Sequence, residues 1–363
     1  MPCEELEPSA GVEHGERGAV AHRRAGDVRH DGDVQVLLLH GGEYSIFPVA
    51  VVGKILLLKM EIEALALQLP KMVYLSRPLL TGMQMEHQGT GRRNFRSRQR
   101  IAGRLRALRL SRGEIAFVHL GQMGYLVRIG QAVVGCDLFL SPLKGRLVPP
   151  LLAPEDVADV DFFIGSHDHA DHIDRPLWRA LARLGTKARF FVPAAVCDSV
   201  LEDTGLPSAQ VIGLDDGDVR TVAGVRVTAL ASAHERLERD ARGRFLALGF
   251  VLSAGGARVY HSGDCCPYDG LQARLAAFGR LTAAFLPING RDAWRLTHGF
   301  IGNMDAHEAV ELAGELAFSA LVPGHHDMFA PNLGDMNECV AFARAKYPAL
   351  KVLPPRTGRI QRI

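Results

Sequence analysis

The segment that most restricts the fold of this chain is a run of histidines and aspartates that directly follows an apolar stretch. Val160 to Ile164 has the composition of a buried β-strand. The run that follows is Ser166-His167-Asp168-His169-Ala170-Asp171-His172-Ile173-Asp174. In extended backbone, side chains two positions apart point the same way, so His167 and His169 can face one cation. The chain must therefore present a cluster of ligand-type side chains at the end of a strand.

The second half of the same run adds a carboxylate and a third imidazole. Asp171 and His172 stand where the chain must turn toward a helix that begins near Pro176, and Asp174 can cap that helix. An exposed polar loop, or a histidine-rich patch that binds metal by chance, is the alternative interpretation. Three imidazoles and two carboxylates within six residues, placed at a strand end, favour a built metal site with positions for two cations.

The chain changes character near Gly113. After this point apolar, β-rich runs end in Gly, Pro or Asp and alternate with helical patterns, which predicts a layered α/β domain over residues 114–363. The expected helices are Pro176–Leu184 and Asp305–Leu316, the second beginning with a capping pair, Asp305 and Glu308. The predicted strands are Ile115–Leu120, Tyr125–Ile129, Ala132–Asp137, Val160–Ile164, Arg189–Val192, Val225–Ala231, Phe245–Leu252, Arg258–His261, Ala283–Pro287 and Ala320–Val322.

Three later strand ends carry further side chains of the ligand type. His234 follows the strand Val225–Ala231, Asp264 lies in a Ser-Gly-Asp turn, and His325 lies in Pro-Gly-His-His-Asp. Taken alone, each is weak evidence, and an aspartate such as Asp264 is more often a turn residue. Because open α/β sheets gather function at the ends of their strands, we expect these loops to converge on one cleft.

The order of these motifs resembles the metallo-β-lactamase superfamily of hydrolases. The shared pattern is HxHxDH, then a His, then the Asp of the Ser-Gly-Asp turn, then a His, and it covers roughly Glu114 to Ile363. The resemblance implies an αββα four-layer sandwich with two metal positions at one edge. By position it assigns His167, His169 and His234 to the first metal, Asp171, His172 and His325 to the second, and Asp264 as the bridging carboxylate.

Within that superfamily, the sequence resembles the L-ascorbate-6-phosphate lactonase branch. The features that carry this resemblance are Gly121-Gln122, the form Ser-His-Asp-His-x-Asp-His-Ile-Asp, Tyr-His-Ser-Gly-Asp at 260–264 and His-His-Asp at 325–327. The implied activity is opening of a lactone ring, of a phosphorylated sugar acid such as L-ascorbate 6-phosphate, by hydroxide that a metal activates. A phosphodiesterase or nuclease on the same fold, or a metal-binding protein without activity, remains the alternative.

The ligand types agree with hydrolysis. Imidazoles and carboxylates without cysteine suit one or two divalent cations, zinc or manganese, better than a closed structural zinc site. A catalytic cation lowers the pKa of a coordinated water to about 7. The resemblance implies catalytic roles for Asp264, which bridges the metals, and for Asp171, as ligand and proton shuttle. Asp168 and Asp327 are candidates for orienting a ligating imidazole.

Two further residues are candidates for substrate binding. Asn289 and Arg291 follow the strand Ala283–Pro287 and are expected to face the same cleft. Arg291 could hold a substrate phosphate through paired hydrogen bonds. A surface ion pair with Asp292 is the alternative, and the sequence favours neither.

Residues 1–113 have a different character, with turn-forming and charged residues around short apolar patches. They predict an irregular extension that is poorly ordered or, if the start codon is misplaced, not native. Arg92 to Arg112 is rich in arginine, but only Phe95 interrupts the charges. A solvated leader is therefore favoured over an arm that binds nucleic acid.

Composition indicates which kinds of binding partner and which cellular compartment to expect. The formal net charge is only +2, so the molecule as a whole is not an evident binder of polyanions. The six cysteines show no CxxC spacing, and no secretory signal or bilayer-spanning stretch is evident, which predicts a cytoplasmic protein without a membrane partner. We expect a small-molecule substrate and no nucleic acid. Self-association into a homo-oligomer is compatible with the sequence.

Overall fold

A computed structural model describes residues 35–40, 43–48 and 101–363 of the chain. The first two ranges are strands β1 (Gln35–His40) and β2 (Glu43–Pro48), which pair antiparallel. They belong to a compact unit over residues 1–86, and a second unit covers residues 87–363. Apart from these two strands, the leader that we predicted to be poorly ordered or non-native lies outside the described residues up to residue 100. The first part of the arginine-rich run lies outside them as well.

The larger unit begins before the boundary that the sequence predicts at Gly113. Helix α3 (Ile101–Arg106) buries Ile101 and Leu105 in an apolar cluster with residues of the first sheet. Its last residue, Arg106, pairs with Asp161 at 2.8 Å. This end of the arginine-rich run therefore packs against the domain, because its apolar face covers part of the core.

Two mixed seven-stranded sheets form the centre of the unit. The order in the first sheet is β16-β3-β4-β5-β6-β7-β8, and in the second it is β15-β14-β13-β12-β11-β10-β9. The strands of the first sheet are β3 (Ile115–His119), β4 (Tyr125–Ile129), β5 (Ala132–Cys136), β6 (Phe162–Ile164), β7 (Arg189–Pro193), β8 (Val211–Leu214) and β16 (Ile360–Arg362). Those of the second are β9 (Val219–Val222), β10 (Val225–Ala231), β11 (Leu248–Ala254), β12 (Ala257–His261), β13 (Ala283–Pro287), β14 (Ala320–Gly324) and β15 (Lys351–Val352).

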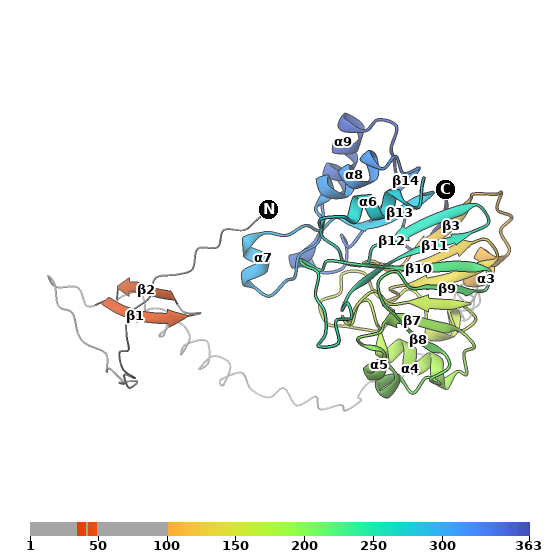
Figure 1. The fold of residues 1–363 in the computed structure, drawn as a ribbon, viewed down its shortest axis with the longest axis horizontal. Helices are drawn as coiled ribbons and strands as arrows, with labels where there is room; N and C mark the ends of the chain where they lie inside the picture. The colour runs from red at the N-terminus through yellow and green to blue at the C-terminus, as the bar shows by residue number, and fades with distance from the viewer. Residues whose placement is uncertain (1–34, 41–42, 49–100) are drawn as a thin grey trace, which may run out of the picture. The chain divides into compact units, whose positions relative to one another are not determined.

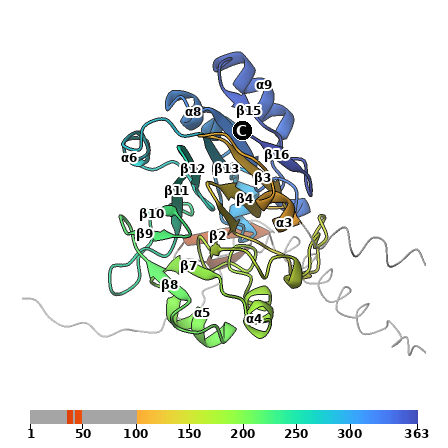
Figure 2. The ribbon, with the colours of Figure 1, turned by 90° about the vertical axis from the view of Figure 1, so that its right-hand side faces the viewer.

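Helices cover the outer faces of both sheets, so the predicted αββα sandwich is confirmed. Figure 1 shows α6, α8 and α9 on one side of the strands and α4 and α5 on the other, and Figure 2 gives the view turned by 90°. The helices are α4 (Arg175–Arg183), α5 (Cys197–Thr204), α6 (Leu271–Ala276), α7 (Ala293–Thr297), α8 (Ala306–Glu315) and α9 (Met336–Lys346), with short 3-10 turns η1 (Pro154–Asp156) and η2 (Ala330–Asn332). Both predicted helices are present, and Asp174 and Asp305 cap them as expected.

Three apolar clusters hold these layers together. The central one lies between the sheets, where Phe117 of the first sheet meets Phe285 of the second edge to face, with ring centroids 5.4 Å apart. The second packs Trp178 and Leu181 of α4 against the first sheet, and the third packs Val310 of α8 against the second. The inner strands of each sheet are thus buried on both faces, which explains the near-continuous apolar runs of these strands.

The strand directions bring the ends of β10, β12 and β14 to one edge of the second sheet. Strands β12, β13 and β14 run parallel, and β10 runs the same way because β11 is antiparallel to both β10 and β12.

Among the described residues, no helix is long and apolar enough to cross a membrane. The five cysteines of residues 101–363 form no disulfide.

Candidate metal centre

The loop after β6 carries the histidine-rich run and is tied to the second sheet. The backbone carbonyl of Ser166 accepts from the N–H of Leu248 at 2.9 Å, and His167 forms a β-bridge with Ala247. The loop after β12 approaches it closely. A Cβ on Gly263 would lie 2.3 Å from the Cβ of Ser166, and Gly263 has a φ of +59°. Only glycine fits there, and this close approach brings the next residue, Asp264, to the histidines.

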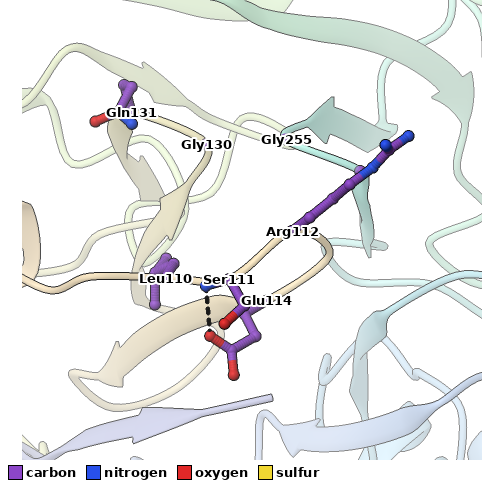
Figure 3. Close-up of a pocket in the computed structure, with 8 residues that line it drawn as sticks. Leu110, Ser111, Arg112, Glu114, Gly130, Gln131 and Gly255 are labelled. Atoms are coloured by element: carbon purple, nitrogen blue, oxygen red, sulfur yellow. Dashed lines mark hydrogen bonds between the residues drawn. The ribbon is translucent and has the colours of Figure 1, made fainter.

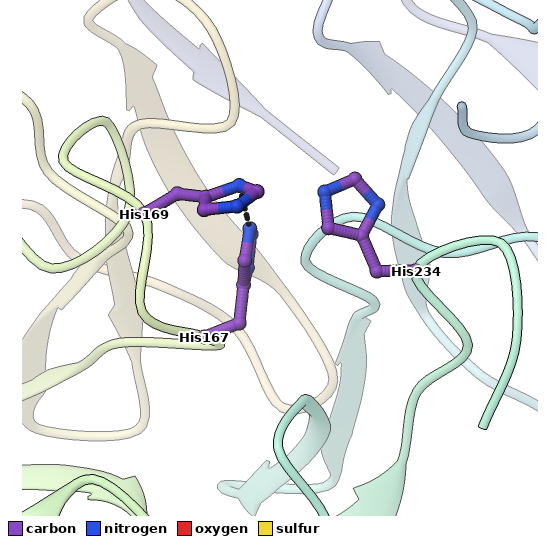
Figure 4. A group of neighbouring side chains, drawn as sticks. All are labelled: His167, His169 and His234. Carbon is purple, nitrogen blue, oxygen red and sulfur yellow. Dashed lines mark hydrogen bonds between the residues drawn. The ribbon is translucent and has the colours of Figure 1, made fainter. Parts of the chain in front are cut away.

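Three imidazoles form the first group of ligand-type atoms. Figure 4 shows His167 and His169 from the loop after β6, and His234 from the loop after β10, with their rings facing a common space. The Nε2 of His167 is 2.9 Å from the Nδ1 of His169, and the ring centroid of His234 lies 4.8 Å from that of His167. Their ligand atoms all lie within 4.8 Å of one another, which is close enough to share one cation.

Asp171, His172 and His325 form the second group, again with ligand atoms within 4.8 Å of one another. Asp264 lies between the two groups. Its Oδ1 is 3.3 Å from the Nε2 of His172, and its Oδ2 is 3.2 Å from the Nε2 of His325 and 3.6 Å from that of His234. The structure thus brings all seven side chains together, and their role as metal ligands stays a prediction.

Two residues that the sequence did not single out orient the imidazoles. The buried carboxylate of Asp137, just after β5, accepts from the Nδ1 of His172 at 2.7 Å and from the Oγ of Ser166 at 2.7 Å. The same Oγ lies 2.9 Å from the Nδ1 of His167, so the serine accepts from that ring. In both histidines Nδ1 is engaged with a neighbour, so Nε2 is the nitrogen that faces the site.

Burial and neighbouring charges shift the pKa values of the imidazoles in opposite directions. Burial, followed by the charge of His172, lowers the pKa of His167 well below 6.5. Burial would also lower the pKa of His172, but the neighbouring carboxylates, Asp264 first, raise it well above that value. For Asp264, burial is outweighed by His172 and His325, which hold its pKa well below 3.8. The centre is therefore built around a carboxylate that stays anionic, the charge that attracts a cation.

The donor set fits divalent metal cations. The Nε2 of His172 and the Oδ1 of Asp264 are buried and lie 3.3 Å apart, and within residues 101–363 neither atom makes a well-formed hydrogen bond. Leaving such atoms unpaired away from water costs about 1–3 kcal/mol each. A cation between the two groups would satisfy both atoms at once, and nitrogen and carboxylate oxygen are ligands of zinc and manganese alike.

The two predicted substrate-binding residues lie on the loop after β13, and both are engaged with the protein. The amide of Asn289 donates to Asn332 at 2.8 Å and accepts from Asn303 at 3.1 Å. The guanidinium of Arg291 bonds both carboxylate oxygens of Glu308 at 2.6 Å. Asp292, the partner of Arg291 in the alternative interpretation, instead lies 3.2 Å from Arg295. Binding of substrate by Asn289 and Arg291 stays a prediction.

Other polar neighbours have roles that differ from those the sequence suggested. Asp168 pairs with Arg175 at the protein surface and not with an imidazole. Asp327 accepts from the backbone N–H of Gln122 at 2.9 Å, so it supports the loop before β4. The Gln122 side chain extends into the centre, where its Nε2 donates to Asp171 at 2.9 Å. The short Gly121-Gln122 feature was the only signal for this residue in the sequence.

A hollow of about 470 Å³ lies elsewhere, between the β4–β5 turn and the β11–β12 turn (Figure 3). Glu114 at its wall accepts from the backbone N–H of Ser111 at 2.6 Å. The residues that line it are Leu110, Ser111, Arg112, Glu114, Gly130, Gln131, Gly255 and Gly256. None of the seven ligand-type side chains is among them, so its size alone does not make it the functional site.

Comparison with known proteins agrees with this arrangement. Residues 135–326, more than half of the chain, match the model of the Beta-lactamase superfamily domain. A "UPF0173 metal-dependent hydrolase" of Hyperthermus butylicus is 25% identical over 60% of this chain and 89% of its own length. A "Probable L-ascorbate-6-phosphate lactonase UlaG" of Salmonella paratyphi B is 24% identical over 57% of this chain and 60% of its own length. The structure of Igni18, a metallo hydrolase from Ignicoccus hospitalis, has the same fold, with a TM-score of 0.52, 22% identity and coverage of 69% and 98%.

The chain therefore belongs to the beta-lactamase superfamily. The fold, the seven converging side chains and the metal-dependent relatives together define a metal-dependent hydrolase with a candidate His/Asp metal site.

Proposed function

We propose that this protein opens the ring of a small lactone by hydrolysis. The observation that carries the proposal is the position of Asp264, whose two carboxylate oxygens face ligand-type nitrogens of both groups at 3.2–3.6 Å. Similarity to the probable lactonase of Salmonella, at 24% identity, supports a lactone as substrate. Because that relative is matched over only 60% of its length, its substrate is part of the proposal.

When bound, one or two divalent cations, zinc or manganese, would supply Lewis acidity and a water of lowered pKa. His167, His169 and His234 would hold one cation, Asp171, His172 and His325 the other, and Asp264 would contact both.

Asp171 is the residue proposed to move the proton. Burial would raise its pKa, but His172 and His325 lower it below 3.8, so the carboxylate is ionised at neutral pH. Its side chain is 19% exposed, which leaves it accessible from the cleft. As water adds to the ring carbonyl carbon, the ester C–O bond breaks. Asp171 takes the proton that the water loses and returns it to the departing ring oxygen, which leaves a hydroxy acid.

A second proposal concerns recognition of an acidic group, such as a phosphate, on the substrate. Arg291 is bonded to Glu308, whereas Arg146 lies beside the loop that follows His325 and forms a β-bridge with Phe329. Burial lowers the pKa of Arg146, and the charges of Asp174, Asp327 and Asp171 oppose this effect. Its Nη2 is buried without a hydrogen-bond partner in the described domain. Arg146 is therefore the better candidate for binding the acidic group.

A substrate panel tests the proposed reaction. Purified protein loaded with Mn²⁺ or Zn²⁺ is assayed on sugar lactones with and without a phosphate, on phosphodiesters and on thioesters. We expect the highest kcat/KM on lactones and a fall of about 100-fold or more in Asp264→Ala, because loss of a metal-site residue weakens both metal binding and catalysis. Asp161→Asn, a change at the opposite end of β6, is the control. Preference for phosphodiesters, or full activity in Asp264→Ala, would contradict the proposal.

A further inference from the structure

Gln122 is held in an unusual conformation at the edge of the metal centre. It lies in the loop between β3 and β4, only 1% of it is exposed, and its φ is +58°. Its N–H donates to Asp327 at 2.9 Å, and its carbonyl accepts from the N–H of His325 at 3.0 Å. Left-handed backbone at a residue other than glycine costs of order 1–3 kcal/mol and persists where the surroundings fix it, most often at functional sites. These backbone hydrogen bonds thus fix the position from which the Gln122 side chain extends.

The side-chain amide ends among the second group of ligand-type atoms. Its Nε2 is 2.9 Å from the Oδ2 of Asp171 and 3.0 Å from the Nε2 of His325. The other amide atom, Oε1, is buried and has no hydrogen-bond partner within residues 101–363. One end of the amide is therefore packed against two predicted metal ligands, while the oxygen that could bind a cation is left without a partner.

The spacing of this amide matches that of a metal ligand. Two atoms that each bind the same cation at about 2.1 Å, with a right angle between the two bonds, lie about 3.0 Å apart. A half-turn about the Cγ–Cδ bond exchanges Nε2 and Oε1, so the oxygen can take the position now held by nitrogen. With a cation among Asp171, His172 and His325, the N–H group would direct positive charge toward it, whereas the amide oxygen would be attracted.

We propose that the Oε1 of Gln122 is an additional ligand of the second cation, beside Asp171, His172, His325 and Asp264. The inference rests on the metal dependence within the proposed function but not on the lactone substrate. A neutral amide oxygen adds a hard ligand without adding charge. This addition favours manganese at the second position relative to a site of imidazoles and carboxylates alone.

Two substitutions separate a ligand from a residue that only positions Asp171. Gln122→Met keeps the length of the side chain but removes the amide. Gln122→Glu keeps oxygen atoms that can bind a cation but removes the N–H that donates to Asp171. A ligand role predicts that the Glu variant binds the second cation at least as tightly as the parent. A positioning role predicts that it binds as weakly as the Met variant, because two carboxylates would then repel each other.

The experiment is a Mn²⁺ titration of the full-length chain after removal of metal by a chelator. Free Mn²⁺ is measured by electron paramagnetic resonance, and bound Mn²⁺ by calorimetry. We expect two equivalents in the parent, a 10- to 100-fold weaker second equivalent in Gln122→Met, and no weakening in Gln122→Glu. Gln131→Met, at an exposed glutamine of the β4–β5 turn, is the matched control and should bind like the parent. Circular dichroism of each metal-free variant checks the fold.

Three results would overturn the proposal: a Met variant that binds both equivalents like the parent, a Glu variant as weak as the Met variant, or a parent that binds a single Mn²⁺. If the Met variant does not fold, the Glu variant decides alone, and weakened binding of the second Mn²⁺ counts against a ligand role. Because the readout is bound Mn²⁺, failure of the lactone assay leaves the result unchanged, and the two proposals fail separately.

Discussion

The Oδ2 of Asp137 lies 2.7 Å from the Nδ1 of His172, and both side chains are fully buried. The same carboxylate accepts from the backbone N–H of Ser166 at 2.8 Å, so it also fixes the start of the histidine-rich loop. Because Nδ1 donates to Asp137, the Nε2 of His172 is free to face Asp264. Asp137, which lies outside the seven ligand-type side chains, thus determines which nitrogen of His172 faces the site.

Replacing Asp137 by Asn tests this relationship. The amide of Asn has the size of the carboxylate but lacks its charge, so it holds the required tautomer of His172 less strongly. We expect Mn²⁺ or Zn²⁺ affinity to fall 10- to 100-fold. Asp161→Asn is the matched control, since Asp161 also accepts from backbone, the N–H of Val133, but precedes β6. Equal metal affinity in both variants would show that Asp137 does not orient the site.

Removal of metal should lower the thermal stability of the whole domain. Without a cation, the buried Nε2 of His172 and Oδ1 of Asp264 lie 3.3 Å apart and make no well-formed hydrogen bond among the described residues. A cation present at 100 times its Kd stabilises the folded state by about 2.7 kcal/mol. For a domain of this size, that corresponds to a change in Tm of roughly 5–10 °C. Thermal unfolding with a chelator, and again after Mn²⁺ is restored, measures the effect. Asp264→Ala should show little response to the chelator, and a parent equally unresponsive would argue against a metal centre.

Local patterns in the sequence predicted a layered α/β domain and the four ligand-type side chains of the histidine-rich run, His167, His169, Asp171 and His172. The histidine-rich run and the strand before it are continuous, so alternation of side chains and the turn toward α4 could be derived from neighbours alone. His234, Asp264 and His325 required the resemblance to known hydrolases, because each stands singly in the sequence. Their convergence depends on the order of strands in two sheets, which periodicity does not give.

What the sequence missed depends on contacts between distant residues. Asp137 precedes His172 by 35 positions, and an aspartate after a strand has the composition of an ordinary turn. Arg291 pairs with Glu308, 17 positions away on α8, and not with the adjacent Asp292. Which of the two carboxylates it binds depends on side-chain conformation, which the sequence does not give. Strand β9 was missed because none of its side chains is buried, so its residues lack the apolar signal of the inner strands.

The Arg291–Glu308 pair predicts a pH-dependent contribution to stability. Burial would raise the pKa of Glu308, but its bond with Arg291 lowers the pKa below the ordinary 4.5. The folded state therefore binds fewer protons than the unfolded chain, and the contribution is present above pH 4.5 and lost as the pH falls through the folded pKa. Because both side chains are partly exposed, we expect only about 0.5–1 kcal/mol at pH 7.

Urea unfolding of Glu308→Gln measures this contribution. Glutamine can still complete the capping box with Asp305, so the comparison removes the charge and keeps the cap. The difference in free energy of unfolding between parent and variant should be present at pH 7 and shrink below pH 4.5. A difference that stays constant with pH would mean that the charge of Glu308 adds nothing, and that any loss comes from the helix cap.

Arg146 predicts how the protein distinguishes substrates with and without an acidic group. Its Nη1 donates to the carbonyl of Ser141 at 2.6 Å and its Nε to that of Val148 at 2.9 Å, and the guanidinium lies 4.2 Å from the ring centroid of Phe139. These contacts fix the guanidinium, and among the described residues its Nη2 is the nitrogen left without a hydrogen-bond partner. A hydrogen bond to a charged group contributes about 1.5–3 kcal/mol. We therefore expect Arg146→Met to raise the KM of a phosphorylated lactone about tenfold or more, with little effect on the unphosphorylated lactone.

Two variants of the same loop control this measurement. Arg146→Lys keeps the positive charge and should recover part of the loss, whereas Lys144→Met removes an exposed charge two residues away and should behave like the parent. Equal increases in KM for both substrates in Arg146→Met would assign Arg146 to the structure of its loop. An increase restricted to the phosphorylated lactone, with partial recovery in Arg146→Lys, requires direct contact between the guanidinium and the acidic group.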